Sequence, residues 1–401
     1  MKIKKKIIKS SLKKVVAPPK IVLKKKRASK KEKPVKTFAK IVLKKKRASK
    51  KEKPVKTVAV KTFVLTKPEE NPIILPKAEN KWEAWQTFNP GVVLLNDKVH
   101  FLYRAIGEDG ISRFGYAISI DGFYIDERFS YSVYEHQVGQ SPSFNIFSYF
   151  SGGSFGGAED PRIVRVDNED ILYIIYTACD EGLRVALTSI KVNDFLNKKW
   201  QWKAPALISK PGETHKNWVI FPEKIDGKYA ILHSISPEIS IAYRHSLEFQ
   251  KDEYIESYYN GNCGRKNCWD SWLKGAGAPP LRTRLGWLLF YHAIDKADPG
   301  KYKVGAMILD LNDPTKILYR AQEPVLEPEK EYENNGFKAG VVYLTGAVIK
   351  DGELLVYYGA SDNYICVAHS NLELFLETLQ KEEKPKLKSK TLKKKTNNYF
   401  D

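Results

Sequence analysis

Residues 91–105, GVVLLNDKVHFLYRA, contain the pattern that decides the fold. Two runs rich in Val, Leu, Phe and Tyr flank the polar turn at Asn96 and Asp97, which is typical of a β-hairpin. Four further hairpins of this kind are predicted at residues 162–178, 219–235, 279–293 and 346–360. Their turns follow one another at intervals of 72, 58, 59 and 66 residues. The chain therefore repeats one β unit along most of its length.

Each hairpin is followed by another short apolar run, which we interpret as a further strand. These runs are GYAISI at 115–120, RVALTSI at 184–190, ISIAYRH at 239–245, VGAMILD at 304–310 and YICVAHS at 364–370. A unit of three or four strands repeated at this period is the pattern of a propeller blade, and a β-sandwich does not normally produce so long a repeat. We predict an all-β, five-bladed β-propeller over residues 63–380, with short helical segments such as 371–379. In such a ring a ligand binds in the central funnel, beside the innermost strands.

The formal net charge of +20 is distributed unevenly along the 401 residues. Residues 1–61 contain 26 Lys and Arg against 2 Glu, and residues 381–401 contain 8 Lys against 3 acidic residues. The body between them contains 33 basic and 42 acidic residues, and 42% of the whole chain is hydrophobic. This composition excludes a wholly disordered protein, and it excludes a folded body that binds nucleic acid through its net charge.

Residues 1–62 form a basic, low-complexity arm, and residues 381–401 form a short basic tail. The segment KIVLKKKRASKKEKPVKT occurs at 20–37 and again, unchanged, at 40–57. Because like charges at this density repel one another, we predict that the arm is disordered, with a basic amphipathic helix as the alternative for its first residues. Two interpretations stay open: an electrostatic tether to nucleic acid or an anionic membrane, and a solubilising tail without a partner.

The four cysteines are Cys179, Cys263, Cys268 and Cys366. They are too few for a disulfide framework, and no second Cys or His pair at zinc spacing accompanies Cys263 and Cys268, so we expect no metal site. The sequence has no run of 18 apolar residues, and its first residues lack the apolar core of a signal peptide. From this we expect a cytoplasmic protein, and we leave its oligomeric state open, a homo-oligomer included.

Charged residues interrupt the strand pattern at several points, and such interruptions mark a candidate site. Glu159, Asp160 and Arg162 enter a strand that we expect to be buried. Burying three charged side chains costs free energy unless they pair with one another or bind a ligand. Asp109 follows the strand that ends in FLYRA, where a lone Asp-Gly is usually a turn.

Further basic residues fall on other predicted strands. On inner strands of neighbouring blades, Arg162, Arg184, Lys216 and His233 would form a cationic pocket suited to an oxyanion such as phosphate. His233 by itself, on an apolar strand, is more often a hydrogen-bonded core histidine.

A last set of residues, aromatic and amide-rich, is typical of a carbohydrate site, although such residues are as often part of a core. It comprises Trp82, Trp85, Asn89, Trp287, Tyr291, His292, Tyr358 and Asp362. The sequence has no P-loop, no dinucleotide-binding glycine pattern and no Ser-His-Asp elbow. We therefore expect neither a nucleotide nor another cofactor.

Six strings in chain order carry a resemblance to a known family. They are FNPGVV at 88–93, YRAIGEDGISRFGYAISIDG at 103–122, GGAEDPRI at 156–163, NWVIFPEKIDGKYAILHS at 217–234, WDSWLKGAGAPPLRTRLGWLLFYHA at 269–293 and GAVIKDGELLVYYGASDNYICVA at 346–368. They strongly resemble glycoside hydrolase family 130, the β-mannoside phosphorylases and related mannosidases. The resemblance implies a five-bladed propeller and inverting phosphorolysis of a β-mannoside to α-mannose 1-phosphate, with inorganic phosphate as co-substrate and no cofactor.

The resemblance also implies roles for individual residues. Asp109 matches the catalytic aspartate, which donates a proton to the glycosidic oxygen. The phosphate-binding set matches Arg162, Arg184, Lys216 and His233. The mannosyl-binding set matches Asn89, Arg104, Asp160, Tyr291, His292 and Asp362.

Departures from the family pattern, such as YHA at 291–293 and YNGNCGRKNCWD at 259–270, leave the acceptor open. The candidates are mannosyl-N-acetylglucosamine, mannosyl-glucose and a β-mannooligosaccharide. Two alternative functions also remain: a β-mannosidase that uses water on the same fold, and a non-catalytic sugar-binding propeller tethered by the basic arm.

Overall fold

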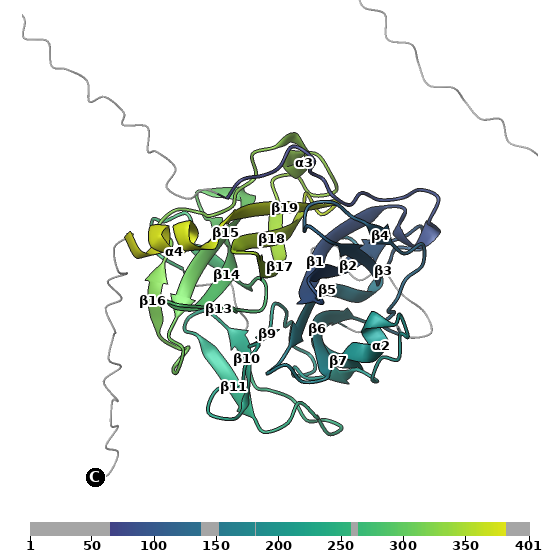
Figure 1. Cartoon of the computed structure of the whole chain (residues 1–401), viewed down its shortest axis with the longest axis horizontal. Coiled ribbons are helices and arrows are strands. Elements are labelled where there is room, and N and C mark those ends of the chain that lie inside the picture. The colour runs from purple at the N-terminus through teal and green to yellow at the C-terminus, as the bar shows by residue number, and fades with distance from the viewer. Residues whose placement is uncertain (1–64, 138–151, 181, 258–263, 382–401) are drawn as a thin grey trace, which may run out of the picture. The chain divides into compact units, whose positions relative to one another are not determined.

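The computed structural model describes residues 65–137, 152–180, 182–257 and 264–381 (Figure 1). They belong to one compact unit, Ala59–Asp401, and the second unit, Met1–Val58, lies outside them. The predicted basic arm therefore lies outside the described residues, as does the basic tail except for Lys381. Within the described residues, no helix is both long and apolar enough to cross a membrane.

The described chain is all-β, as predicted, with a few short helices. The largest sheet contains two antiparallel groups of strands. The first group is β1 (Gln86–Leu95), β2 (Lys98–Ile106), β3 (Ile111–Ser119) and β4 (Glu127–Arg128). The second group is β5 (Gly156–Arg165), β6 (Ile171–Cys179), β7 (Leu183–Lys191) and β8 (Ala206–Leu207). Two parallel pairs between β3 and β5 join these groups.

Three further antiparallel groups form sheets of their own (Figure 1). The third group is β9 (Val219–Ile220), β10 (Tyr229–Ser234) and β11 (Ser240–Arg244). The fourth is β12 (Trp272–Ala276), β13 (Leu281–Thr283), β14 (Gly286–Asp295), β15 (Asp298–Leu309) and β16 (Ile317–Arg320). The fifth is β17 (Val342–Lys350), β18 (Glu353–Ala360) and β19 (Tyr364–Asn371). The helices are η1 (Lys81–Glu83), α2 (Val192–Leu196), α3 (Glu331–Asn334) and α4 (Leu372–Lys381).

All five predicted hairpins are present, and one differs in detail. In the fourth group the predicted hairpin joins β13 to β14, but β13 pairs with only one end of β14. The other end of β14 pairs with β12, a strand that the hairpin pattern did not include. The predicted helix at 371–379 corresponds to α4.

Five apolar clusters form the core, and each lies between two groups that follow one another. They join the first and second groups, the second and third, the third and fourth, the fourth and fifth, and the fifth and first. Alternate side chains of a strand point to opposite sides, so Val92 contacts the fifth group and Val93 the second. Both faces of most strands are buried for this reason, which explains their nearly continuous apolar runs.

The first strand of several groups is bulged at its start, and the bulges position the candidate site. β1 shifts register between Phe88 and Gly91, and β5 shifts between Glu159 and Arg162. A bulge re-aims the side chain at its centre. A Cβ on Gly91 would lie 2.6 Å from the carbonyl oxygen of Pro161, so β1 and β5 approach each other too closely here for any side chain.

The segment before β1 is fastened to the last strand of the fifth group. Thr66 and Ile74 form isolated bridges with His369 and Ile365 of β19. Between them, the buried Asn71 amide donates to the carbonyl of Val367 at 2.7 Å and accepts from its backbone N–H at 2.9 Å. One side chain thus satisfies both backbone groups of a buried residue.

Replacing the Asn71 amide tests how much the contact between this segment and β19 stabilises the fold. Asn71→Ala leaves a buried N–H and a buried C=O of Val367 unpaired, so we expect the free energy of unfolding to fall by about 1–3 kcal/mol. Asn312→Ala, at an exposed asparagine, is the control and should change it by less than about 0.5 kcal/mol. Urea denaturation measures both, and equal midpoints would show that the segment contributes no stability.

Candidate active site

Asp160 is the centre of the candidate site. It lies at the bulge of β5 with φ 50°, and its side chain is 2% exposed. Its Oδ1 accepts a hydrogen bond from Nδ2 of Asn89 at 2.7 Å and pairs with Nη1 of Arg104 at 3.1 Å. Burial alone would raise the pKa of this carboxyl, but the charges of Arg104, Lys216 and Arg162 outweigh burial and lower it. Asp160 is therefore a carboxylate held by partners from β1, β2 and β5.

Arg104 of β2 is fully buried, and its contacts hold the acidic residues of β5 in place. Its Nη2 pairs with Oε1 of Glu159 at 3.0 Å, and its Nε donates to Oγ of Ser112 at 2.9 Å. The guanidinium also lies 4.5 Å from the centroid of the Phe88 ring. The resemblance predicted that Arg104 holds the mannosyl ring; in the structure it pairs with Asp160 and Glu159, so it orients the Asp160 carboxylate.

Arg162 is also buried, and each of its three guanidinium nitrogens donates to protein. Nε donates to the carbonyl of Gly277 at 2.9 Å, Nη1 to the carbonyl of Asp160 at 2.6 Å, and Nη2 to Oδ1 of Asn217 at 3.0 Å. The same oxygen of Asn217 accepts from the hydroxyl of Tyr343 on β17 at 2.5 Å. Arg162 therefore joins the second group to the third and fourth, and Asn217 extends this link to the fifth.

Asp362 contributes a second buried carboxyl at the turn between β18 and β19. Burial raises its pKa, and the charges of Lys338 and Arg104 offset this only in part. Its carboxylate pairs with no side chain in the described part of the chain. Asp362 therefore differs from Asp160, whose carboxylate is neutralised by partners.

His292 is on β14 and is fully buried. Its Nε2 is 2.9 Å from the carbonyl of Leu344, and its ring stacks on Tyr343 with a centroid separation of 3.9 Å. Burial and the charge of Arg162 lower the pKa of His292 to about 3, so the ring is neutral at pH 7. His292 thus packs against the Tyr343 ring and holds it in place.

Asn217, which accepts a hydrogen bond from Arg162, also lines a cavity of about 490 Å³. Three lysines line it, Lys216, Lys274 and Lys338, together with the rings of Trp272 and Tyr302. No carboxylate is among its described lining residues. Burial and the charges of Lys338 and Lys216 lower the pKa of Lys274 to about 8. A cationic cavity thus adjoins a buried acidic cluster.

Four of the predicted site residues lie elsewhere. Asp109 is at the turn between β2 and β3, where its side chain is 50% exposed and pairs with Arg113 at 2.6 Å. Burial alone would raise its pKa, but the hydrogen bonds from Arg113 and from the backbone N–H of Ile111 lower it. In this arrangement Asp109 is a carboxylate without the raised pKa of a group kept protonated at neutral pH.

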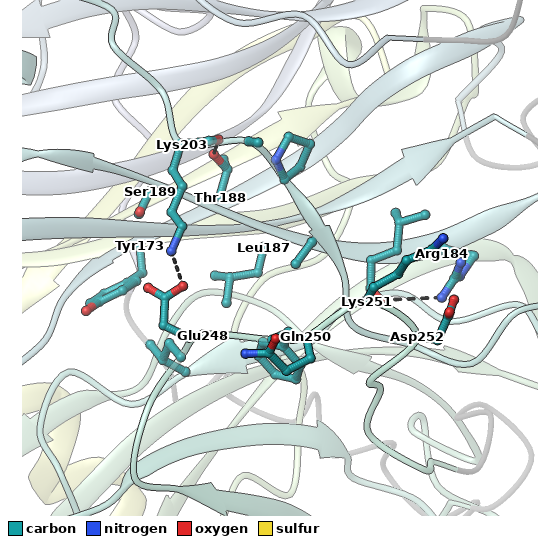
Figure 2. A pocket seen from close by; sticks show the side chains of 16 residues that line it. Tyr173, Arg184, Leu187, Thr188, Ser189, Lys203, Glu248, Gln250, Lys251 and Asp252 are labelled. Atoms are coloured by element: carbon teal, nitrogen blue, oxygen red, sulfur yellow. Dashed lines mark hydrogen bonds and ion pairs between the residues drawn. The ribbon is translucent and has the colours of Figure 1, made fainter.

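Arg184 is on β7, the third strand of its group, and not on an inner strand as predicted. Figure 2 shows it at one end of a separate cavity of about 380 Å³, near Asp252, with the ion pair of Lys203 and Glu248 at the other end. Its guanidinium donates to the carbonyls of Ser209 and Leu207. It also lines a cavity of about 350 Å³ that shares Leu183 and Thr214 with the lysine-lined one.

His233 is on β10, the second strand of its group, where Nδ1 is 2.8 Å from Oγ of Ser257. Burial and the charge of His215 lower its pKa to about 4, so it adds no positive charge at pH 7. These contacts are those of a hydrogen-bonded core histidine, which the sequence analysis gave as the alternative for His233.

Tyr291 is also separate from the site. It is fully buried, and its hydroxyl donates to Asp270 at 2.9 Å and accepts from Nε of Arg320 at 3.2 Å. It belongs to a charged network within the fourth group, so no surface of its ring is available to a sugar.

The structure brings together Asn89, Arg104, Asp160, Arg162, Lys216, His292 and Asp362, and adds residues that sequence reasoning missed. Tyr343 was part of an apolar run, and Lys274 and Lys338 were single lysines in a chain with many. The signal for Lys274 is its place directly before Gly275, whose φ of 124° requires glycine at the bulge of β12.

Among the described residues, no cluster of three or more His, Cys, Asp or Glu side chains could hold a metal ion. Cys268 and Cys366 are free thiols, Cys179 is buried, and Cys263 lies outside the described residues.

Comparisons with known proteins agree with one another. A family model described as beta-1,4-mannooligosaccharide phosphorylase matches residues 29–381. A 1,2-beta-oligomannan phosphorylase of Thermoanaerobacter sp. (strain X514) is 36% identical over 318 residues, which cover 76% of this chain and 96% of the relative. A beta-1,2-mannobiose phosphorylase of the same strain is 33% identical over 321 residues, which cover 76% of this chain and 97% of the relative. The structure of beta-1,2-mannobiose phosphorylase from Listeria innocua, in complex with beta-1,2-mannobiose, superposes with a TM-score of 0.59 at 26% identity. The superposition covers 78% of this chain and 98% of the Listeria chain.

The titration of Lys274 tests the electrostatics of the cavity. We expect its amine to titrate near pH 8, measured by NMR of protein labelled at lysine Cε. Lys338→Met removes one of the two repelling charges, so the pKa should move part of the way toward 10.5, while burial keeps it below that value. Because the pKa is depressed, Lys274 carries its charge below pH 8 and loses it above. A normal pKa in the wild type would show that the lysines are not close together.

Proposed function

The chain belongs to glycoside hydrolase family 130 and is a β-mannoside phosphorylase, and we propose that its substrate is a β-1,2-linked mannoside. In the proposed reaction, inorganic phosphate displaces the leaving sugar with inversion and gives α-mannose 1-phosphate. The linkage is proposed because the two Thermoanaerobacter relatives, which align over nearly their whole length, act on β-1,2-mannosides by name.

One observation carries the proposal: a cavity lined by three lysines, with no carboxylate among its described lining residues, adjoins a buried cluster of Asp160, Asn89 and Asp362. Carboxylates and amides suit the hydroxyl groups of a sugar, whereas ammonium groups suit an oxyanion. The two halves fit a mannosyl ring and a phosphate that must meet at one anomeric carbon.

The charge distribution favours phosphate over water as the nucleophile. An inverting hydrolase needs a carboxylate base to activate water on the face opposite the leaving group. Phosphate is already an anion and needs only a cationic cradle. The proposed mechanism therefore uses no cofactor, and its remaining requirement is a proton donor for the glycosidic oxygen.

We also propose that the five strand groups are the blades of a five-bladed propeller. Support comes from the five core clusters, which link each group to the next and the fifth to the first. The candidate site then lies where the first strands of the blades meet.

Product analysis tests the reaction and the linkage together. With β-1,2-mannobiose and inorganic phosphate, we expect α-mannose 1-phosphate and mannose in equal amounts, and no turnover when phosphate is omitted. β-1,4-Mannobiose and mannosyl-β-1,4-N-acetylglucosamine, tested in parallel, should be cleaved more slowly. Release of mannose alone, at a rate independent of phosphate, would instead identify a β-mannosidase.

We propose Asp109 as the proton donor, following the family resemblance, with Asp362 as the competing assignment. Asp362 has the raised pKa that a general acid requires, whereas the pKa of Asp109 is lowered by Arg113. Leaving-group dependence distinguishes a lost acid from a lost sugar contact, because a good leaving group departs without protonation.

Asp109→Asn and Asp362→Asn are therefore compared on β-1,2-mannobiose and on 2,4-dinitrophenyl β-mannoside. The variant that lacks the donor should lose about 10²–10⁴-fold in turnover on the disaccharide and recover most of it on the activated substrate. Glu135→Gln is the matched control, because Glu135 pairs with the same Arg113. If neither aspartate variant is rescued by the activated substrate, both assignments are wrong.

A further inference from the structure

A further cavity, of about 460 Å³, has no part in the function proposed above. Two segments line it: residues 132–137, which lead from the first strand group toward the second, and residues 202–205, which lead from α2 to β8. Trp202 and Tyr134 supply its aromatic surface. Its polar described lining residues are Ser132, Glu135, His136, Gln137 and Lys203. Aromatic rings with a few polar groups, in a cavity of this size, are typical of a small-ligand site.

The indole of Trp202 is held in place by its neighbours. Its Nε1 donates to the carbonyl of Val133 at 2.6 Å. The ring stands edge-on to Tyr134, with centroids 5.3 Å apart, and lies parallel to Trp200 at 6.2 Å. A ring fixed in this way loses little conformational entropy when a ligand packs on it. Because the C–H groups on one face of a sugar ring pack well on an aromatic surface, Trp202 is suited to a sugar.

The charges that line this cavity are paired with other protein groups. Nε of Arg113 pairs with Glu135 at 2.9 Å, and Lys203 pairs with Glu248 (Figure 2). The lysine-lined cavity beside Asn217, in contrast, has only positive charges among its described lining residues. Where that cavity suits an anion, this one suits a neutral ligand with hydroxyl groups.

Hydrogen-bonding groups for such a ligand come from His136 and Gln137. Burial lowers the pKa of His136 below its ordinary value of 6.5, and the charge of Asp180 offsets this only in part, so the ring is neutral at pH 7. Its Nδ1 lies 2.9 Å from the hydroxyl of Tyr176, and its Nε2 has no partner in the described part of the chain. Gln137 is exposed, and its amide offers both a donor and an acceptor.

The cavity adjoins the proposed proton donor. Arg113 pairs with Asp109 at 2.6 Å as well as with Glu135, so one guanidinium separates the acid from the cavity lining. A general acid protonates the oxygen that joins the cleaved mannosyl unit to the leaving sugar. Groups beyond Asp109 are therefore placed to meet the rest of the leaving chain. His136 also lines the 350 Å³ cavity, which shares residues with the lysine-lined one.

We propose that this cavity binds a distal sugar of a β-1,2-mannooligosaccharide, on the leaving-chain side of the cleaved bond. Trp202 packs on one face of that sugar, and His136 and Gln137 bond to its hydroxyls. Glu135 and Lys203 contact no ligand, because their charges are already paired. The assignment rests on the proposed function and extends it: the enzyme favours chains longer than a disaccharide, and Trp202 is the reason.

Binding of β-1,2-mannooligosaccharides of two to six sugars, without phosphate, tests the assignment in the absence of turnover. We expect the Kd, measured by calorimetry, to fall roughly 10-fold once the chain is long enough to reach the cavity. Trp202→Ala should abolish this gain and leave the Kd of mannobiose within about twofold of the wild type. Gln137→Ala should weaken binding of the long chains roughly threefold. Tyr243→Ala, at an exposed aromatic residue on β11, is the control and should change neither.

Trp202 also packs against the core, so its role in the fold is tested separately. Thermal denaturation confirms that each variant is folded, and Trp202→Phe, which keeps a ring, should retain most of the gain. With phosphate present, kcat/KM for the hexasaccharide should fall roughly 10-fold in Trp202→Ala, while that for mannobiose stays constant. An equal loss on both substrates would indicate a structural role and overturn the assignment. So would a wild-type Kd that is the same at every chain length.

The two proposals can fail separately. Trp202-dependent binding of long mannosides without any mannose 1-phosphate would overturn the proposed function and leave the sugar site in place. Mannose 1-phosphate formation by an enzyme whose affinity does not depend on chain length would overturn the site alone.

Discussion

The buried pair of Asp160 and Arg104 is the constraint on which the rest of the site depends. A lone carboxylate at 2% exposure is too costly to keep ionised, so Asp160 requires the guanidinium of Arg104, the amide of Asn89 and the charges nearby. Both Asp160 and Asn89 adopt a left-handed backbone, which Asp and Asn tolerate better than other side chains, and both stand at bulges. Because such a pair contributes little net stability, its value lies in fixing where the Asp160 carboxylate points.

The site is divided by charge between the strand groups, with Asp362 of the fifth group on the acidic side. The first two groups supply Asn89, Arg104, Glu159 and Asp160, in which the charges are paired with one another. The third, fourth and fifth groups supply one lysine each, and the fifth also supplies the buried carboxyl of Asp362. In the proposed reaction, a mannosyl ring on the acidic side meets phosphate on the cationic side. Such an arrangement strengthens the electrostatic attraction of a nucleophile without supplying a base, which is what phosphorolysis requires.

The sequence predicted the strands well, because hairpins and two-sided burial are local features: apolar runs around polar turns identified all five hairpins and the strands that follow them. It also predicted that Asp160 and Arg162 needed partners. It misplaced Arg184 and His233, since a polar residue in an apolar run does not reveal whether it lies on the first, second or third strand of its group. The prediction that Tyr291 contacts a sugar has the same weakness. The sequence around an aromatic residue in a buried strand does not show whether its ring faces a ligand or, as for Tyr291, its hydroxyl bonds to Asp270 and Arg320. The pairing of Asp109 with Arg113 depends on side-chain geometry, which spacing does not specify.

Lys274 and Lys338 were hidden for a different reason. Each is one lysine among many, and neither interrupts an apolar run. Lys274 is at the bulge of β12, whereas Lys216 lies before β9 and Lys338 before β17, so the three lysines occupy different positions in their groups. They meet because segments of the third, fourth and fifth groups line one cavity. That proximity depends on how the groups pack against one another, which no pattern within a single group specifies.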